Sequence, residues 1–351
     1  MMLRSHRRNP RFKSALPHHS SPKGGCMNSV NLSTSPKFID LFSGAGGFSL
    51  GFTQMGFQDL LAVEQNETAA RTYGLNFPTS TVVVDDIKKV HSLDILNIIT
   101  EKIDLLLASP PCEPFTSANP KRKSTPWERF YHDPQGDLVF HAIRIIGDIH
   151  PDFFVIENVI PITEPESQDI LKEEFSINGY DKIFFNFVSA EKHGCPSIRK
   201  RIFISNIRLQ LSLRKETTVL NAIGDLPSPN YPNNYQDHFT LPLARQVKDK
   251  VHKIRKGAAA VHFMGAKGKI RNWIRLNEND VCPTVMGKSR FLHPIEDRPL
   301  TIREQARLLS FPDNYVFTGS VEDMFNQIGE AVPPVISKQI AEIILNRLRK
   351  K

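Results

Sequence analysis

The sequence predicts an α/β protein with a doubly wound, mostly parallel sheet and a second, smaller domain. Short apolar runs at residues 37–42, 59–63, 81–84, 103–107 and 152–156 each end in turn or polar residues, as buried parallel strands do. A glycine-rich turn follows the first run. In the stretch from 207 to 286, by contrast, the apolar residues follow no clear strand or helix period. We therefore expect a basic tail over 1–35, the larger domain over 36–206, the smaller domain over 207–322 and a returning segment over 323–351.

Composition and the first residues exclude several classes of protein. The chain has 351 residues and a net charge of +8. It has no run of about 18 uncharged apolar residues, so we expect no transmembrane helix. The first 25 residues hold six Lys and Arg, no acid and no apolar core, which predicts a disordered basic tail rather than a secretory signal. Met27 is an alternative start, and an arginine-rich transit peptide is an alternative that no amphipathic period supports.

The four cysteines, Cys26, Cys112, Cys195 and Cys282, include no close pair. Their spacing fits neither a metal site nor a disulfide framework, so we expect no metal and a reducing cytosol. A thiol nucleophile would stay available in that compartment.

The glycine-rich turn, Gly44-Ala45-Gly46-Gly47, is of a type that binds nucleotides. Its glycines allow a tight turn and close approach of a ligand, although Ser49 stands where a dinucleotide fingerprint has its third glycine. The second run ends in Glu64, where a carboxylate can accept both ribose hydroxyls. The third ends in Asp85-Asp86-Ile87, where a carboxylate could take an adenine amino group and the isoleucine could pack on its face. These features predict adenosine binding; the alternative is that each acid only caps the next helix.

Cys112 follows the fourth run, on the loop Ser109-Pro110-Pro111-Cys112. This places it at the carboxyl edge of the predicted sheet, where open α/β sheets carry their chemistry. Prolines at 110, 111 and 114 stiffen the backbone, which suits a nucleophile that must meet an electrophile at a defined angle. The alternative is a buried, inert cysteine.

The segment from Phe38 to Gly47, Phe-Ile-Asp-Leu-Phe-Ser-Gly-Ala-Gly-Gly, together with Pro110-Pro111-Cys112, resembles the DNA cytosine-5 methyltransferase family. The resemblance implies a class I S-adenosylmethionine-dependent methyltransferase fold with a target-recognition domain, and Cys112 as the nucleophile. Glu113 replaces the usual Gln and Thr116 the commoner Ser. By resemblance, the loop from Asn119 to Asp133 is a mobile lid over the flipped base. The implied contacts to S-adenosylmethionine are Phe42, Ser43, Gly44, Ala45, Gly46, Gly47, Glu64, Asp86, Ile87, Pro111, Leu138 and Glu330.

The fifth run ends in Glu157-Asn158-Val159, which matches the family's Glu-Asn-Val motif. Cytosine is a poor electrophile at C6 until N3 is protonated or hydrogen-bonded, so a carboxylic acid beside the ring favours addition of a thiolate. Burial could raise the pKa of Glu157 and help it carry that proton. A lone glutamate at a strand end would otherwise be a helix cap.

Residues 193–204 resemble the family's Gln-x-Arg-x-Arg motif running into a strand. The arginines match as Arg199 and Arg201, and Ser197 stands in the Gln position. The resemblance implies that one arginine holds the cytosine carbonyl and the other a phosphate or the lid. The fixed donor fork of arginine suits both tasks. The alternative is the basic edge of a strand.

The stretch from 206 to 290 carries 15 Lys and Arg against 6 Asp and Glu, which predicts a polyanion partner. By position it corresponds to the family's target-recognition region, where basic side chains supply phosphate affinity and a few polar ones read base edges. The DNA-binding residues that we expect there are Arg255, Lys256, Lys267, Lys269, Arg271 and Arg275.

The last two family motifs follow this region. Residues 298–313 match the ninth motif, in which Thr301 and Glu304 form a capping box, so its first role is structural. Residues 327–334 match the last motif, with Glu330 where Asn is common. An amphipathic helix over Val335–Leu348 would pack back onto the first domain.

These features predict a DNA cytosine-5 methyltransferase that acts on a flipped cytosine in a short duplex sequence, because C6 cannot be reached inside the stack. We expect a monomer in the prokaryotic cytosol, double-stranded DNA as partner, no membrane contact, and the modification role in a restriction-modification system with a cognate endonuclease. Two alternatives stay open: transfer-RNA cytosine-5 methylation and a non-catalytic DNA-binding relative. Methylation of an amino group is disfavoured, because those enzymes use an Asp/Asn-Pro-Pro-Tyr/Phe loop without a thiol.

Overall fold

The computed structural model describes residues 35–266 and 268–350. The predictions for the basic tail, including Cys26 and Met27, lie outside the described residues. The same holds for the prediction that Lys267 binds DNA.

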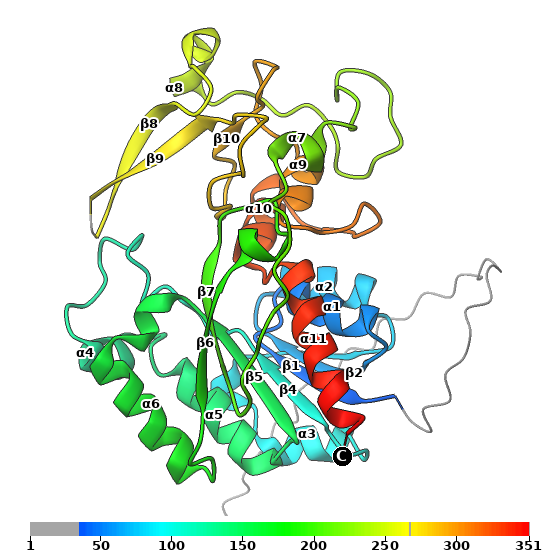
Figure 1. Ribbon diagram of the computed structural model, residues 1–351, viewed down its shortest axis with the longest axis vertical. Coiled ribbons are helices and arrows are strands. Elements are labelled where there is room, and N and C mark those ends of the chain that lie inside the picture. The colour runs from blue at the N-terminus through cyan, green and yellow to red at the C-terminus, as the bar shows by residue number, and fades with distance from the viewer. Residues whose placement is uncertain (1–34, 267, 351) are drawn as a thin grey trace, which may run out of the picture. The chain divides into compact units, whose positions relative to one another are not determined.

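The larger sheet has seven strands in the order β3-β2-β1-β4-β5-β7-β6. β7 runs antiparallel to both of its neighbours, while the other strands share one direction (Figure 1). This arrangement confirms the predicted doubly wound, mostly parallel sheet. The strands are β1 (Lys37–Leu41), β2 (Gln58–Glu64), β3 (Thr81–Val84), β4 (Leu105–Ala108), β5 (Phe153–Asn158), β6 (Phe184–Ser189) and β7 (Lys200–Ser205).

Helices cover both faces of this sheet. Because successive strand residues point to opposite faces, Phe38 of β1 joins the cluster that packs on α1, α2 and α11, while Ile39 joins the cluster that packs on α3, α5 and α6. These helices are α1 (Gly47–Gln54), α2 (Glu67–Asn76), α3 (Ser92–Ile98), α5 (Leu138–Ile149), α6 (Pro165–Ile177) and α11 (Pro334–Leu348).

Strand register gathers the predicted chemistry at one edge of the sheet. Leu41 at the end of β1 pairs with Val63 of β2 and with Ala108 of β4, and Ala108 pairs with Ile156 of β5. The turns that follow β1 and β4, and the last residues of β2 and β5, therefore meet at the carboxyl ends of the parallel strands.

A three-stranded sheet lies in the part of the chain predicted to be the smaller domain. β8 (Ala259–Gly265) and β9 (Gly268–Arg275) form an antiparallel hairpin, and β10 (Phe291–Leu292) pairs parallel with β9. The sequence did not predict this hairpin. Polar and apolar residues do not alternate regularly between its exposed and buried faces: apolar Met264 is 61% exposed, while Asn272 is half-buried. The helices of this region are α7 (Val219–Ile223), α8 (Arg245–Lys248), α9 (Ile302–Leu308) and α10 (Val321–Glu330).

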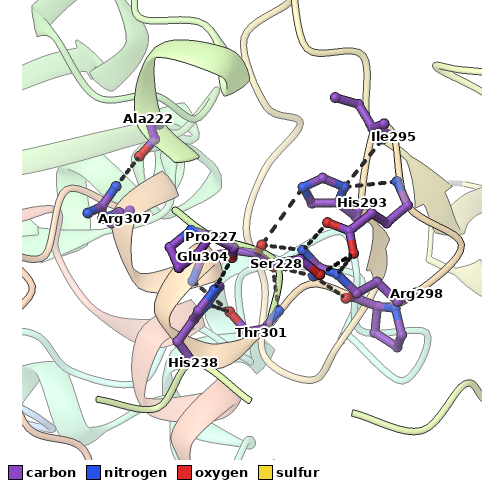
Figure 2. A network of polar contacts seen from close by, with 12 residues as sticks. Ala222, Pro227, Ser228, His238, His293, Ile295, Arg298, Thr301, Glu304 and Arg307 are labelled. Carbon is purple, nitrogen blue, oxygen red and sulfur yellow. Dashed lines mark hydrogen bonds and ion pairs between the residues drawn. The ribbon is translucent and has the colours of Figure 1, made fainter. Parts of the chain in front are cut away.

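A buried polar network anchors α9 to the segments before it (Figure 2). Thr301 and Glu304 form the predicted capping box, which confirms its structural role. Arg298 donates two hydrogen bonds to the Glu304 carboxylate, at 2.7 and 2.8 Å. His238 bridges the Thr301 hydroxyl and the Pro227 carbonyl, at 2.9 and 2.7 Å. The charged side chains of this network thus stabilise the fold around α9.

Helix α11 returns to the first part of the chain, as predicted. A Cβ added to Gly51 of α1 would lie 2.2 Å from the Lys338 backbone nitrogen, so the two helices approach closely and a larger residue cannot replace this glycine. The Ser337 hydroxyl also donates to the Phe48 carbonyl. Helix α11 thus helps to cover the face of the sheet to which Phe38 belongs.

Part of the predicted lid is helical. Thr125 and Glu128 form a capping box with Pro126 at the first turn, which starts α4 (Pro126–Tyr131). Phe130 of this helix is buried in the core. The expectation of one continuous loop from Asn119 to Asp133 is therefore wrong in its second half.

Within residues 35–266 and 268–350, no helix is both long and apolar enough to cross a membrane.

Candidate active site

The turn between β1 and α1 contains three residues with left-handed backbone, Phe42 (φ 56°), Gly44 (φ 53°) and Gly46 (φ 88°). A Cβ at Gly46 would lie 2.3 Å from the Phe77 ring, and one at Gly47 would lie 2.5 Å from the Val332 carbonyl. At Gly44, by contrast, no atom lies within 4 Å of an added Cβ. Gly46 and Gly47 thus serve close packing, whereas Gly44 faces open space where a ligand fits.

Glu64 connects the end of β2 to this turn. Its carboxylate accepts the backbone N–H of Gly44 and of Asn66, both at 2.8 Å. Burial raises the pKa of Glu64, and the backbone donors oppose that shift. Nearby, the Ser43 hydroxyl is buried and has no partner within the described chain. The turn therefore offers a carboxylate and a free hydroxyl beside the open space at Gly44.

The other predicted cofactor residues lie on neighbouring elements. Asp86 accepts the backbone N–H of Lys88 at 3.0 Å and so caps a short 3-10 helix. Ile87 and Leu138 are buried in the core on the second face of the sheet, whereas Pro111 is half-buried beside the thiol.

A chain of hydroxyls and carboxyls, which sequence reasoning missed, lies buried behind the glycine turn. The Asp40 carboxyl lies 2.5 Å from the Ser49 hydroxyl, which lies 2.7 Å from the Tyr73 hydroxyl, which lies 2.6 Å from the Asp59 carboxyl. Three such contacts need three protons, and two hydroxyls supply only two. One carboxyl must therefore carry a proton. Burial raises the pKa of Asp40 to about 8 and that of Asp59 to about 6.

Cys112 sits on a tight turn after β4. Its carbonyl accepts the N–H groups of Phe115 and Thr116, at 3.0 and 2.9 Å. From the neighbouring strand β5, the Asn158 side chain donates to the Pro110 carbonyl at 3.1 Å. These bonds hold the backbone of Pro110 and Cys112 on either side of Pro111. Asn158 belongs to the matched Glu-Asn-Val motif, and that motif was the signal that could have found it.

Glu157 and Arg201 face each other across two antiparallel strands. Glu157 of β5 pairs with Phe203 of β7, so Arg201, two residues earlier on β7, is its diagonal neighbour on the same face. Arg201 Nε lies 2.8 Å from Glu157 Oε1, and Glu157 is 5% exposed. The carboxyl is therefore buried with a cation against it.

Arg199 ties three distant segments together at the start of β7. It donates from Nη1 to the Val285 and Gly329 carbonyls and from Nη2 to the Glu330 carbonyl, at 3.3, 2.9 and 3.3 Å. Burial, and then the charge of Arg201, lower the pKa of Arg199 to about 10. Its Nε is buried without a partner in the described residues. Ser197, in the Gln position of the motif, donates to the Pro283 carbonyl at 3.1 Å.

Opposing charges surround the thiol. Burial raises the pKa of Cys112; Arg201 and Arg199 lower it, whereas Glu157 and Glu330 raise it. The pKa of Glu330 is itself raised, first by burial and then by Glu64. Cys112, Glu157, Arg199 and Arg201, predicted from three separate motifs, are thus brought together. Glu330 stands between them and the glycine turn.

The basic residues predicted to bind DNA fall into different environments. Arg255, Lys256, Lys269 and Arg271 are exposed, and Lys256 pairs with Glu278. The prediction for Arg275 is wrong, because this residue is 6% exposed and its guanidinium bonds the Ile254, Val251 and His293 carbonyls and the Asp297 carboxylate. An arginine with those bonds holds the scaffold and cannot reach a phosphate.

The fold and the site define the class of protein first. The chain has the class I methyltransferase fold, as does the crystal structure of an Escherichia coli prophage protein described as a DNA modification methyltransferase. That structure superposes with a TM-score of 0.73 and 26% identity over 90% of this chain and 100% of its own. Spodoptera frugiperda DNMT2, at 16% identity and a TM-score of 0.61 over 89% of this chain and 100% of its own, shares the fold.

The family follows from the sequence match. The model of the C-5 cytosine-specific DNA methylase family matches residues 36–346, and the chain belongs to that family. It is 41% identical to M.MJ0563P of Methanocaldococcus jannaschii, over 88% of this chain and 99% of that protein. It is 32% identical to the type II methyltransferase M1.HphI of Haemophilus parahaemolyticus, over 88% and 86% of the two chains. The protein is a DNA cytosine-5 methyltransferase.

Proposed function

We propose that this enzyme transfers a methyl group from S-adenosylmethionine to C5 of a cytosine flipped out of a specific short DNA sequence. The observation that carries this proposal is the meeting of Cys112 with the Glu157–Arg201 ion pair, at the sheet edge that also carries the glycine turn. Relatives named type II methyltransferases support the modification role in a restriction-modification system.

Cys112 is the nucleophile in this proposal. Its thiolate adds to C6 of the cytosine, and Arg201 and Arg199 favour the thiolate by lowering the pKa that burial raises. The proline-stiffened turn and the Asn158 bond to Pro110 hold the sulfur at one angle to the ring. When the C5 proton is lost, the thiolate leaves again and the cysteine is regenerated.

Glu157 assists at N3 of the cytosine. A carboxyl there donates or shares a proton as the thiolate adds, and takes it back when the thiolate leaves. The Arg201 guanidinium, with Nε 2.8 Å from Glu157 Oε1, places a positive charge against the carboxyl. Arg201, whose side chain is 16% exposed, serves as the donor to the cytosine carbonyl, whereas three carbonyls hold the more deeply buried Arg199 in the scaffold.

The glycine turn fits S-adenosylmethionine. The cofactor supplies the methyl group when it is bound. Open space at Gly44 and the free Ser43 hydroxyl suit a close-lying ligand, and Glu64 suits a ribose. Phe42 and Ala45 lie in this turn, and Asp86, Pro111 and Glu330 would complete the cofactor site.

Exposed Arg255, Lys256, Lys269 and Arg271 would contact DNA phosphates. We place the enzyme, as a monomer, in the prokaryotic cytosol, beside a cognate endonuclease whose cleavage its methylation blocks. Arg275 has no part in this surface.

The test is methyl transfer from labelled S-adenosylmethionine to unmethylated genomic DNA, with wild type beside Cys112→Ala and bisulfite sequencing of the product. We expect label on C5 of cytosine in one short recurring sequence, and none with the variant. Wild-type protein that binds the cofactor but labels no DNA would overturn the proposal. Label in DNA that every tested endonuclease still cleaves would overturn the restriction-modification role alone.

A further inference from the structure

The loop that follows Cys112 is fixed at both ends. At its start, Phe115 is 1% exposed and its ring lies 4.9 Å from that of Phe130. At its end, α4 is buried through Arg129 and Phe130, and a Cβ on Gly136 would lie 1.6 Å from the Arg129 carbonyl. Between these ends, residues 116–124 bury no apolar side chain. We call these residues the 116–124 loop.

One carboxylate, that of Glu164, holds this loop. Arg122 of the loop donates from Nη2 to Glu164 Oε1 at 2.9 Å and from Nη1 to the Phe115 carbonyl at 3.0 Å. Arg129 of α4 donates from Nη1 to Glu164 Oε2 at 2.7 Å. The two arginines outweigh the burial of Glu164 and lower its pKa. The carboxylate thus joins the loop to the fixed helix.

The two arginines differ in what else holds them. Arg129 is 2% exposed and also donates to the Lys123 and Ser124 carbonyls, at 2.9 and 2.6 Å. If Arg122 leaves Glu164, the carboxylate keeps Arg129, so no buried charge is left without a partner. Arg122, whose side chain is 8% exposed, has one other acceptor, the Phe115 carbonyl, so it is the less firmly held of the two arginines.

The surroundings of the loop suit a polyanion. Lys121, Arg122 and Lys123 are consecutive, and the two lysines are exposed; Lys123 acts on Glu128 through its charge, but neither lysine forms a close ion pair in the described chain. The Ser117 carbonyl accepts the N–H of Ala266 at 2.9 Å, at the tip of the β8–β9 hairpin. That hairpin carries exposed Lys269 and Arg271. A phosphate matches a carboxylate as a charged, bidentate acceptor for arginine.

We propose that Glu164 is a catch: it holds the 116–124 loop through Arg122 in the DNA-free enzyme, and a DNA phosphate takes Arg122 from it on binding. The inference rests on the proposed DNA substrate. Glu164 is a positioning residue, because it touches neither the thiol nor the residues that surround it. Glu164 and a DNA phosphate compete for Arg122. Removing the charge of Glu164 should therefore strengthen DNA binding.

Glu164→Gln removes the competing charge and leaves one acceptor oxygen where the two arginines used two. Duplex affinity should rise by about threefold to tenfold. Arg122→Gln removes the exchanged cation, so affinity should fall and the salt dependence of binding should lose about one phosphate contact. Both variants remove the Arg122–Glu164 ion pair but keep the Arg129 bonds at Lys123, so trypsin should cleave faster at Lys121 in each, and DNA should protect that bond in Glu164→Gln. A purely structural role for Glu164 would give faster cleavage with weaker binding.

Glu166→Gln is the matched control. Glu166 is exposed on the first turn of α6 and has no ion-pair partner in the described residues, so this variant makes the same change in net charge. We expect wild-type cleavage and affinity. The catch is wrong if Glu164→Gln binds duplex no more tightly than Glu166→Gln. Wild type that retains S-adenosylmethionine binding but fails to bind duplex DNA would overturn the proposed substrate, and the catch with it.

Discussion

Two groups of buried carboxyls lie near the same sheet edge, and the free-energy cost of burying them is offset in different ways. In the catalytic group, formed by Cys112, Glu157, Arg199 and Arg201, the glutamate has an arginine nitrogen 2.8 Å away. In the hydroxyl chain, formed by Asp40, Ser49, Asp59 and Tyr73, no basic side chain contributes to either carboxyl. Burial of a carboxylate must be offset by a nearby cation or by a proton.

The difference separates the tasks of the two groups. In the first group, the charge of the neighbouring arginine offsets the burial of the carboxyl. A carboxyl bridged by hydroxyls holds its proton inside the fold, and here it supports the glycine turn rather than the chemistry. Three experiments test this contrast.

The largest effect is expected at Glu157. Glu157→Gln keeps an acceptor for Arg201 but cannot deliver a proton to N3, so kcat should fall by about 10²-fold to 10⁴-fold. Single-turnover methyl transfer measures this step directly. Binding of S-adenosylmethionine should be unchanged, since the glycine turn is untouched. A loss of less than about tenfold would remove Glu157 from the role of proton carrier.

The second effect concerns stability against pH. The pKa of Asp40 is raised from 3.8 to about 8, so the folded state holds a proton that the unfolded state releases, and stability falls as pH rises between those values. Asp40→Asn cannot titrate, so its stability at pH 9 relative to pH 5 should exceed that of wild type by on the order of 4 kcal/mol. Urea unfolding at the two pH values measures this difference.

Exposed Asp94→Asn is the control for Asp40, and its pH profile should follow that of wild type. The charged groups that act on Asp40 are Asp59 and Glu64, and Tyr73 and Tyr315 lie close enough for Asp40 to raise their pKa values. Parallel pH profiles for Asp40→Asn and wild type would mean that the chain of hydroxyls carries no shared proton.

The smallest effect concerns the thiol. Arg201 lowers the pKa of Cys112, so Arg201→Gln should raise it and slow alkylation by iodoacetamide at pH 8 by about threefold to tenfold. Mass spectrometry of the Cys112 peptide isolates this thiol from buried Cys195 and Cys282. Lys200→Gln removes an exposed charge next to Arg201 on β7 and should leave the rate unchanged. Equal alkylation rates in wild type, Arg201→Gln and Lys200→Gln would mean that Arg201 does not activate the thiol.

The sequence predicted the parts of the site that rest on strand ends. Five apolar runs give five parallel strands. Because the carboxyl ends of parallel strands share an edge, the sequence alone predicts that Cys112 and Glu157 lie close together. The turn between β1 and α1 was found in the same way. Local pattern and sheet topology agree in this half of the chain.

What could not be predicted depends on partners far apart in the chain. Arg275 and Arg271 look alike in sequence, yet one is buried among carbonyls and the other is exposed. Asp40, Ser49, Asp59 and Tyr73 come from separate elements, and no spacing rule joins them. The hold of Glu164 on the loop likewise depends on a contact 42 residues away in sequence.

The packing of α11 on α1 has a consequence for synthesis on the ribosome. The apolar face that contains Phe48 and Phe52 is completed only when α11 emerges, almost three hundred residues after α1 ends. At roughly 5–20 residues per second, that face waits for some tens of seconds without its cover. The nascent chain therefore exposes this apolar face for the whole of that interval.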